Sequence, residues 1–518
     1  MTRHLTLILA FISFALPLFS ATVTLSGTIT YDKVIYTRPD TNLDETTIQE
    51  ALYGAKVEAL EGTTVLASSE TDSSGNYSLS FTYTTNYNIV VYAQNSTSKV
   101  GAVTSGSVVT SIYSDTFVSA GTETGTATQN HNVTVANNNI AGAFNIFQQC
   151  ERGRRFFATA GASVTNIKCF WPADGTYFDP TTGVLYFLGV TSSNSDPDEF
   201  DDDVVLHEFG HFVAENISLD HSLGGQHSIF GEVDMRLAWS EGLATFISCA
   251  IRNDPVYVDS AGSTVSGKTI TSNYDNSQPS SRSKYSTNEV AVSYVLWNAF
   301  KLDTSINNIL SSLQQFKSLP SNLSGEQISL DTFHDLYTTQ DIRTYYQNRS
   351  IEYSVDVLDG LTADSAYQID SPTSFTLSGL TFYPSSDKDY FQFTATNGQF
   401  YSIQTSNALN GALSSLKVYK KGDLSTAVAN AQITNQTSDD TSGIQFTATD
   451  SSTYIIEVQR FTSSSLGYGP NSGVYSSTVG RYGGYSLLVS DAVLPTAAVS
   501  TPSAGSSGGG GGGCFLSK

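Results

Sequence analysis

The segment from Asp201 to Val213 constrains the fold most, because it contains the pattern His-Glu-x-x-His. On a helix, positions four residues apart lie on the same face, so His207 and His211 can direct their imidazoles at one ion. This pair favours zinc, and Glu208, next to the first histidine, can reach a water on that ion. The spacing therefore predicts a helix that carries two zinc ligands and a general base.

A catalytic zinc needs a third protein ligand and an open fourth position. Glu241 follows His211 by thirty residues and lies in the apolar segment 237–246. A carboxylate in such surroundings needs a partner, and a metal ion would provide one. We therefore expect Glu241 to be the third ligand. The alternative is a glutamate that is hydrogen-bonded on a half-exposed helix face.

The motif at residues 207–211, followed by Trp-Ser-Glu-Gly-Leu-Ala at residues 239–244, resembles the gluzincin class of zinc metallopeptidases, the thermolysin-like fold group. The resemblance extends to secreted bacterial proteins of this class and covers about residues 140–300. It implies an α+β zincin-like catalytic domain. Carried over position by position, it implies His207, His211 and Glu241 as Zn²⁺ ligands and Glu208 as the general base.

The resemblance has one departure near the third ligand. Thermolysin-like enzymes have an aspartate four residues after the zinc glutamate, where it orients a ligand histidine, and this chain has Thr245 there. Such a supporting carboxylate usually contributes about 10- to 100-fold to metal affinity or activity. We therefore expect Asp234 or another carboxylate to replace it, or the site to be weaker than its relatives.

Peptide hydrolysis also requires a hydrogen-bond donor for the tetrahedral oxyanion. His227, between the two halves of the motif, and Tyr285, in the segment 283–289, are the candidates by position in the sequence. The alternative for each is a loop residue with a structural hydrogen bond.

Two segments before the motif have more than one interpretation. Residues 183–190 form a short apolar run that predicts a strand, either a ledge on which an extended substrate pairs or an ordinary core strand. Residues 195–203 contain six acidic side chains. They complement a helix N-terminus, and Ca²⁺ is the second metal that such a run could bind.

Composition and the N-terminus indicate export. Residues 1–21 have the features of a secretory signal peptide, with an uncleaved anchor as the alternative. No second apolar run of spanning length follows, so we expect no transmembrane span after cleavage and a secreted, extracellular protein. The 25 basic and 48 acidic residues give a net charge of −23, which argues against nucleic acid as a partner. Cys150 and Cys169 could pair in an oxidising compartment, but their spacing leaves this open.

Strand-rich segments flank the motif region. Residues 22–136 alternate with period two and resemble the transthyretin-like, carboxypeptidase-regulatory β-sandwich family, through the segments 26–29, 54–57 and 71–77. Residues 366–492 resemble the bacterial pre-peptidase C-terminal domain, a β-sandwich attached to secreted peptidases. Residues 493–518 form a Gly/Ser-rich linker and tail in which Cys514 suggests cell-surface attachment, with a free thiol as the alternative.

The sequence therefore predicts a multidomain chain with an α+β zincin-like catalytic domain at residues 137–365 between two all-β sandwich domains. The expected function is that of a secreted zinc-dependent metalloendopeptidase acting on protein or peptide substrates. The alternative is a cell-surface binding or adhesion protein with a degenerate peptidase domain, for which the departure at Thr245 is the best argument.

Overall fold

The computed structural model describes fifteen stretches of the chain, which together include every candidate site residue. They are residues 21–37, 44–136, 139–189, 198–222, 224–225, 227–229, 231, 233–261, 268–275, 283–318, 328–384, 386–406, 414–432, 442–460 and 483–493. The predicted signal peptide, the first part of the acidic run and the tail with Cys514 lie outside the described residues.

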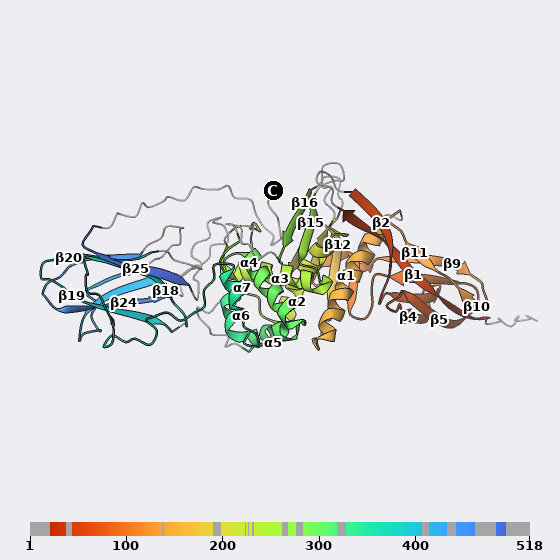
Figure 1. Ribbon diagram of the computed structural model, residues 1–518. Helices are drawn as coiled ribbons and strands as arrows, with labels where there is room; N and C mark the ends of the chain where they lie inside the picture. Colours follow the sequence, from red (N-terminus) through yellow and green to blue (C-terminus); the bar gives the residue numbers. More distant parts are fainter. Residues whose placement is uncertain are drawn as a thin grey trace, which may run out of the picture.

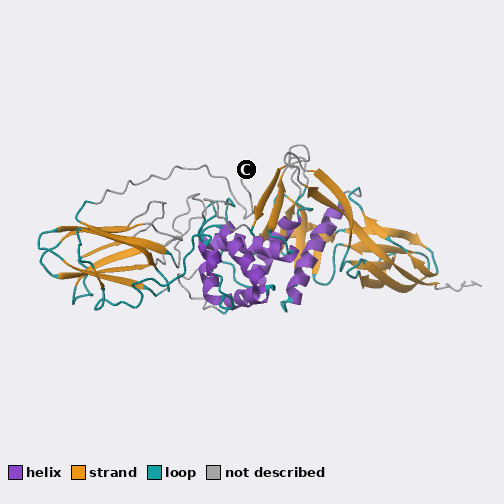
Figure 2. Cartoon of the chain, viewed as in Figure 1, coloured by secondary structure: helices purple, strands orange, loops and turns teal. Residues whose placement is uncertain are grey.

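The chain is laid out in three successive parts (Figure 1). Strands dominate the first part, helices the middle and strands the last (Figure 2). This confirms the expected multidomain architecture, with an α+β region between two β-rich regions.

The first part contains two β-sheets that share one core. β1 pairs antiparallel with β2 and β5 and parallel with β10 and β11, while the second sheet has the order β4-β3-β6-β9. Alternation explains the burial: in β5, Tyr77, Leu79, Phe81 and Tyr83 are buried and the residues between them are exposed. The strands are β1 (Ala21–Thr37), β2 (Asp44–Ala51), β3 (Lys56–Glu61), β4 (Thr64–Glu70), β5 (Asn76–Tyr83), β6 (Tyr87–Tyr92), β9 (Ser114–Gly121), β10 (Gly125–Thr128) and β11 (His131–Val133).

A third sheet joins the first part to the middle. Its order is β13-β14-β12-β7-β8, from β7 (Ser98–Ser105), β8 (Val108–Ile112), β12 (Ile167–Ala173), β13 (Tyr177–Asp179) and β14 (Val184–Leu188). Strand β7 pairs in parallel with β12, and helix α1 (Ile140–Thr159) packs against β1, β7 and β12. One hydrophobic core extends from Val23 to Tyr353. Because sheet and core cross the expected limit at residues 136–137, we infer that the first two parts fold as one unit.

Two glycines let the middle helices approach closely. A Cβ on Gly210 would lie 2.7 Å from Ala244 Cα, and a Cβ on Gly242 would lie 2.5 Å from Val292 Cβ. Glycine at these positions therefore permits α2, α3 and α4 to pack backbone to backbone. The helices are α2 (Asp202–Ile217), α3 (Met235–Arg252), α4 (Glu289–Asp303), α5 (Asn307–Phe316), α6 (Leu330–Leu336) and α7 (Arg343–Gln347), with the hairpin β15 (Val256–Ala261) and β16 (Lys268–Asn273).

The last part is a two-sheet β structure with its own core. The sheets have the orders β17-β19-β24-β21-β22 and β18-β25-β20-β23. Side chains such as Phe391, Ile403 and Leu487 fill the space between them. The strands are β17 (Tyr367–Gln368), β18 (Ser374–Thr381), β19 (Lys388–Thr394), β20 (Phe400–Ser406), β21 (Ser414–Lys420), β22 (Ala429–Gln432), β23 (Ser442–Thr447), β24 (Thr453–Arg460) and β25 (Gly484–Ser490).

Cys150 on α1 and Cys169 on β12 are adjacent in the core. Their sulfur atoms lie 3.7 Å apart, and both side chains are buried as free thiols. In the structure they do not form the disulfide that their spacing in the sequence left open. Among the described residues, no helix has the length and apolar character needed to cross a membrane.

Candidate metal centre

Helix α2 begins in an acidic turn whose carboxylates are bound by protein donors. Asp201 accepts hydrogen bonds from the backbone amide and the hydroxyl of Ser260. The next two carboxylates form ion pairs: Asp202 with Lys33 and Asp203 with Arg252, each at 2.5 Å. Within the described part of the chain, this turn is not among the side-chain groups that bring ligand atoms close enough for one metal ion. The carboxylates at residues 201–203 thus serve structural contacts, and Ca²⁺ binding by the run stays a prediction.

His207, His211 and Glu241 converge where α2 packs on α3. The Nε2 atoms of the two histidines are 3.1 Å apart, and Glu241 Oε2 lies 3.2 Å from His207 Nε2 and 3.4 Å from His211 Nε2. Zinc bonds of about 2.0–2.1 Å at tetrahedral angles separate ligand atoms by about 3.3 Å. The three ligand atoms therefore have the spacing that a tetrahedral zinc ion requires on one face.

The charges in this cluster favour a cation. Burial acts against ionisation of Glu241, but His211 and the other nearby imidazoles hold the pKa of its carboxyl well below the usual range. Burial likewise opposes protonation of His211, yet Glu241 raises the pKa of that imidazole to about 9. An ionised carboxylate in a buried setting attracts positive charge strongly, whether as a proton or as a metal ion.

Thr245 occupies the position where thermolysin-like enzymes have an aspartate, and it contacts His207, a candidate ligand. Its Oγ1 lies 3.0 Å from His207 Nδ1. If Nδ1–H donates to this hydroxyl, Nε2 keeps the lone pair that a metal needs. Asp234 does not take this role, because it caps α3 and binds Arg236. Of the alternatives that the sequence left open for the missing carboxylate, Asp234 is therefore not the one that contacts His207.

A carboxylate does support the second histidine through a hydroxyl. His211 Nδ1 lies 3.3 Å from Ser240 Oγ, which donates a 2.6 Å hydrogen bond to Asp220 Oδ2. Since the Ser240 hydrogen points at Asp220, its oxygen is free to accept from His211 Nδ1–H. Both imidazoles thus have a partner that leaves Nε2 directed at the cluster.

Thr245→Val tests the hydroxyl contact to His207. We expect zinc affinity to fall by about 10- to 100-fold, because an outer partner of a ligand histidine is lost without a change in shape. Competition with a chromogenic chelator measures the affinity, and Thr245→Ser, which keeps the hydroxyl, should retain it. Equal zinc affinity of the Val variant and the parent would show that the Thr245 hydroxyl does not support metal binding by His207.

Glu208 lies beside the cluster without joining it. Its side chain is 1% exposed, and its Oε1 has no hydrogen-bond partner among the described residues. Burial raises the pKa of Glu208, which His207 and His211 lower in turn, as does a hydrogen bond from the Phe178 backbone. A carboxylate with one unpaired oxygen next to a metal site has the properties of a general base.

His227 lies on the other side of Glu241, together with a residue that sequence reasoning missed. His227 Nε2 is 3.6 Å from Glu241 Oε2 and 3.5 Å from Glu289 Oε2, and both side chains are buried. Burial raises the pKa of Glu289 to about 7. Burial opposes protonation of His227, but Glu241 and Glu289 raise its pKa. Glu289 opens an apolar helix after the cap Asn288, so its sequence context indicates only a first-turn acidic residue.

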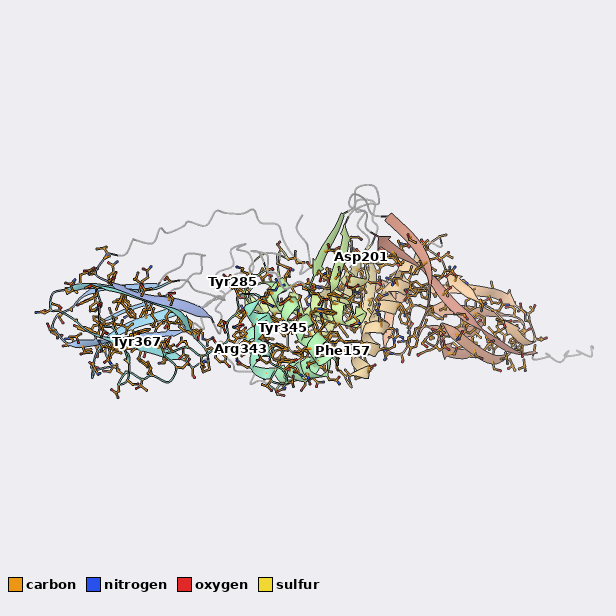
Figure 3. The ribbon with its side chains drawn as sticks, viewed as in Figure 1. Phe157, Asp201, Tyr285, Arg343, Tyr345 and Tyr367 are labelled. Carbon is orange, nitrogen blue, oxygen red and sulfur yellow. The ribbon has the colours of Figure 1, made fainter. Side chains whose placement is uncertain are left out.

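Tyr285 lies in the loop just before α4 (Figure 3). Its backbone has φ 69°, its N–H donates to the Arg349 carbonyl, and its carbonyl accepts from Asn288. These contacts fix the loop and do not tie the phenol to the metal cluster. The oxyanion role of Tyr285 stays a prediction.

Within the run 183–190, where a strand is expected, Val184–Leu188 form β14, which is not an edge strand of its sheet. Residues 184–186 pair with β12 on one side and β13 on the other. With both edges occupied, this stretch cannot add a substrate strand, so it is an ordinary sheet strand. Strand β13 lies outside it, and Phe178 of β13 hydrogen-bonds to Glu208.

Comparison with known families agrees with this geometry. Residues 159–352 match the family described as the mycolysin C-terminal domain, and residues 387–460 match the bacterial pre-peptidase C-terminal domain. The first span contains the entire His/Glu cluster. The middle of the chain is thus similar to the thermolysin-like class of zinc peptidases, the class that its sequence resembles. More narrowly, the chain carries a mycolysin C-terminal domain followed by a pre-peptidase C-terminal domain, as the sequence resemblance predicts for these two parts.

Several solved structures are similar to about a quarter of the chain. They include the pre-peptidase C-terminal domain of a Bacillus anthracis collagenase, with 17% identity over 24% of this chain and 93% of that one and a TM-score of 0.17. Another is PliG of Aeromonas hydrophila, a periplasmic inhibitor of g-type lysozyme, with 17% identity over 24% and 94% and a TM-score of 0.15. With TM-scores this low, we infer nothing about this chain from these two structures. No curated protein matches it.

Proposed function

We propose that the chain is a secreted zinc-dependent metalloendopeptidase in which His207, His211 and Glu241 hold the metal. The observation that carries the proposal is the cluster itself: three ligand atoms 3.1 to 3.4 Å apart, with the unpaired carboxylate oxygen of Glu208 beside them. When bound, zinc supplies a Lewis acid that lowers the pKa of a water and polarises the scissile carbonyl. Export is supported by the pre-peptidase C-terminal domain, which is typical of secreted bacterial peptidases.

The chain's own residues carry the proton transfers. Glu208 takes the proton of the attacking water and returns it to the leaving amine. His227 donates to the developing oxyanion, and Glu289 stabilises the protonated imidazole at 3.5 Å. An extended substrate lies along β13, whose partner β14 occupies only one of its edges among the described strands.

Metal removal tests the proposal. The zinc-loaded chain should cleave an unfolded protein at internal peptide bonds, a chelator should stop cleavage, and added zinc should restore it. Unfolded substrate is needed because a peptide must be extended to lie beside β13. A chain that holds zinc but cleaves no bond in a peptide library would favour the alternative, a binding protein with a degenerate peptidase domain.

His227→Ala tests the oxyanion donor. We expect kcat to fall by about 10²- to 10³-fold with little change in KM, because the donor acts mainly in the transition state. Zinc content should stay at one per chain. The matched control is His221→Ala, an exposed histidine of the same loop, which should keep full activity. Loss of zinc in the His227 variant would show that His227 is a metal ligand and not the oxyanion donor.

A further inference from the structure

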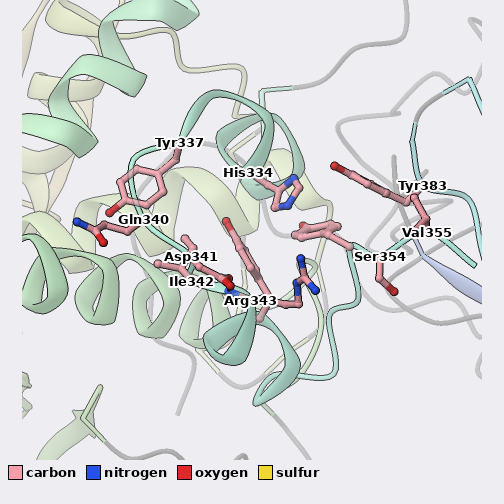
Figure 4. Close-up of a pocket in the computed structure, with 11 residues that line it drawn as sticks. His334, Tyr337, Gln340, Asp341, Ile342, Arg343, Ser354, Val355 and Tyr383 are labelled. Carbon is pink, nitrogen blue, oxygen red and sulfur yellow. The ribbon is translucent and has the colours of Figure 1, made fainter.

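A second group of side chains beside the candidate metal centre has the composition of a metal site. His227, Glu241 and Glu289 each bring one ligand atom to within 4.8 Å of the others, and all three side chains are buried. We call these three residues the second ligand group. It shares Glu241 with the group that contains His207 and His211. The pocket beside α6 and α7 is lined by other residues, so it is separate from this group (Figure 4).

Three separate elements supply the second ligand group. His227 lies between α2 and α3, Glu241 is on α3, and Glu289 is the first residue of α4. His227 Nε2 is 3.6 Å from Glu241 Oε2 and 3.5 Å from Glu289 Oε2. Ligand atoms of a four-coordinate zinc ion are about 3.3 Å apart. The three side chains therefore need only small movements to meet on one ion.

The orientation of His227 directs one ring nitrogen at both carboxylates. His227 Nδ1 lies 3.1 Å from the carbonyl oxygen of Gly225, which can only accept a hydrogen bond. Nδ1 therefore carries a hydrogen, and Nε2 is the nitrogen that faces Glu241 and Glu289. Because a bare lone pair would repel the two carboxylates, Nε2 needs a positive ion, either a proton or a metal ion.

Burial strengthens this need for positive charge. Glu241 and Glu289 are each 7% exposed. Carboxylates removed from water are costly unless they are paired with positive charge. An ion held by His207, His211 and Glu241 neutralises Glu241 and leaves Glu289 facing His227. The place for a cation between Glu289 and His227 therefore remains after the first ion is bound.

We propose that His227, Glu241 and Glu289 bind a second zinc ion next to the first, with the Glu241 carboxylate bridging the two ions. The second ion takes the place of the proton on His227 Nε2, and that proton goes to solvent. Zinc suits a mixed set of imidazole and carboxylate ligands, whereas Mg²⁺ and Ca²⁺ prefer oxygen ligands alone. Ions in two-metal sites are about 3.5–4 Å apart and repel each other. The second ion therefore binds more weakly than the first, and dialysis removes it while the first remains.

Occupation of the second site withdraws His227 from the reaction proposed above. With a zinc ion on Nε2, the imidazole has no hydrogen there to donate to the oxyanion. Zinc beyond one ion per chain should therefore lower the cleavage rate. This consequence rests on the proposed function, whereas binding of the second ion does not.

Zinc binding to the metal-free full chain, measured by equilibrium dialysis and metal analysis, tests the proposal. The parent should bind two ions, the second at least about 100-fold more weakly than the first. In Glu289→Gln the affinity for the second ion should fall by more than about 100-fold, because a direct ligand is lost. The first ion should be retained, which shows that the variant is folded. Glu215→Gln, the same change at an exposed position of α2, should bind both ions as the parent does.

Cobalt(II) in place of zinc tests whether the two ions are neighbours. A bridging carboxylate couples their unpaired electrons, so the electron paramagnetic resonance signal of the chain with one cobalt ion should weaken as the second ion binds. A signal that grows in proportion to cobalt up to two ions per chain would overturn the proposal. An unchanged affinity of Glu289→Gln for the second ion would also overturn it, and would assign that ion to the acidic surface of the chain.

Neither binding measurement needs turnover, so this proposal and the peptidase proposal fail separately. A chain that binds both ions at these residues and cleaves nothing contradicts the proposed function alone. A chain that cleaves with one ion and binds no second ion contradicts the second site alone.

Discussion

Glu208→Gln should slow peptide hydrolysis strongly and leave zinc content at one per chain. The side chain is buried beside the ligands but is not one of them, and its unpaired oxygen makes it the proton acceptor of the proposed reaction. Glutamine keeps its shape and removes its basicity. We expect kcat to fall by about 10²- to 10⁴-fold, the usual contribution of a general base. Metal analysis and the cleavage rate of an unfolded protein measure the two properties on one sample.

Glu215→Gln is the matched control for this variant, because it makes the same change at an exposed position of the same helix. It should keep both zinc and activity. If Glu208→Gln loses its zinc, Glu208 is part of the ligand set or of the fold, and the assigned role is wrong.

Glu241→Gln has the opposite signature, with zinc and activity lost together. Glu241 Oε2 lies 3.2, 3.4 and 3.6 Å from the Nε2 atoms of His207, His211 and His227, so three imidazoles converge on this carboxylate. An amide cannot replace its charge. We expect zinc affinity to fall by more than about 100-fold, a larger loss than removal of an outer partner causes.

Zinc content after dialysis and the midpoint of thermal unfolding measure this loss. Added zinc should raise the midpoint of the parent and not that of the variant, because only a chain that binds zinc is stabilised by it. Zinc retained in the variant with undiminished affinity would show that Glu241 is not a ligand.

The sequence could predict the four residues of the candidate site, because they lie on two helices with recognisable patterns. His207, Glu208 and His211 lie on one helix, so their relation follows from local geometry alone. Glu241 is predictable because a carboxylate in an apolar helix needs a partner. The structure brings these four residues together, as expected.

The partners of the ligands could not be predicted, because they depend on tertiary packing. Thr245 on α3 reaches His207 on α2 only because the two helices pack closely, and Gly210 permits this close approach. The link from His211 through Ser240 to Asp220 joins three separate positions, and Glu289 reaches His227 from a third helix. Sequence periodicity predicts helices and strands but does not indicate which side chains from separate elements will meet.

The sheet that joins the first two parts was missed for a similar reason. Strand β7 has the period-two pattern of its neighbours in the first part, yet it pairs with β12, which follows it by more than fifty residues. The same sheet places β13 outside β14, so of the two alternatives for this run, ledge or core strand, residues 184–186 are an interior strand. Strand pairing between distant segments is set by the whole fold, so alternation identifies strands and not their neighbours.

The most direct test of the account is a zinc titration of the metal-free wild-type chain, with cleavage of an unfolded protein as the readout. We predict that the rate rises in proportion to bound zinc and stops rising at one zinc per chain, because the proposed catalytic ion is the one that His207, His211 and Glu241 hold. A chain that binds one zinc and cleaves nothing, or one that cleaves equally well without zinc, would contradict it.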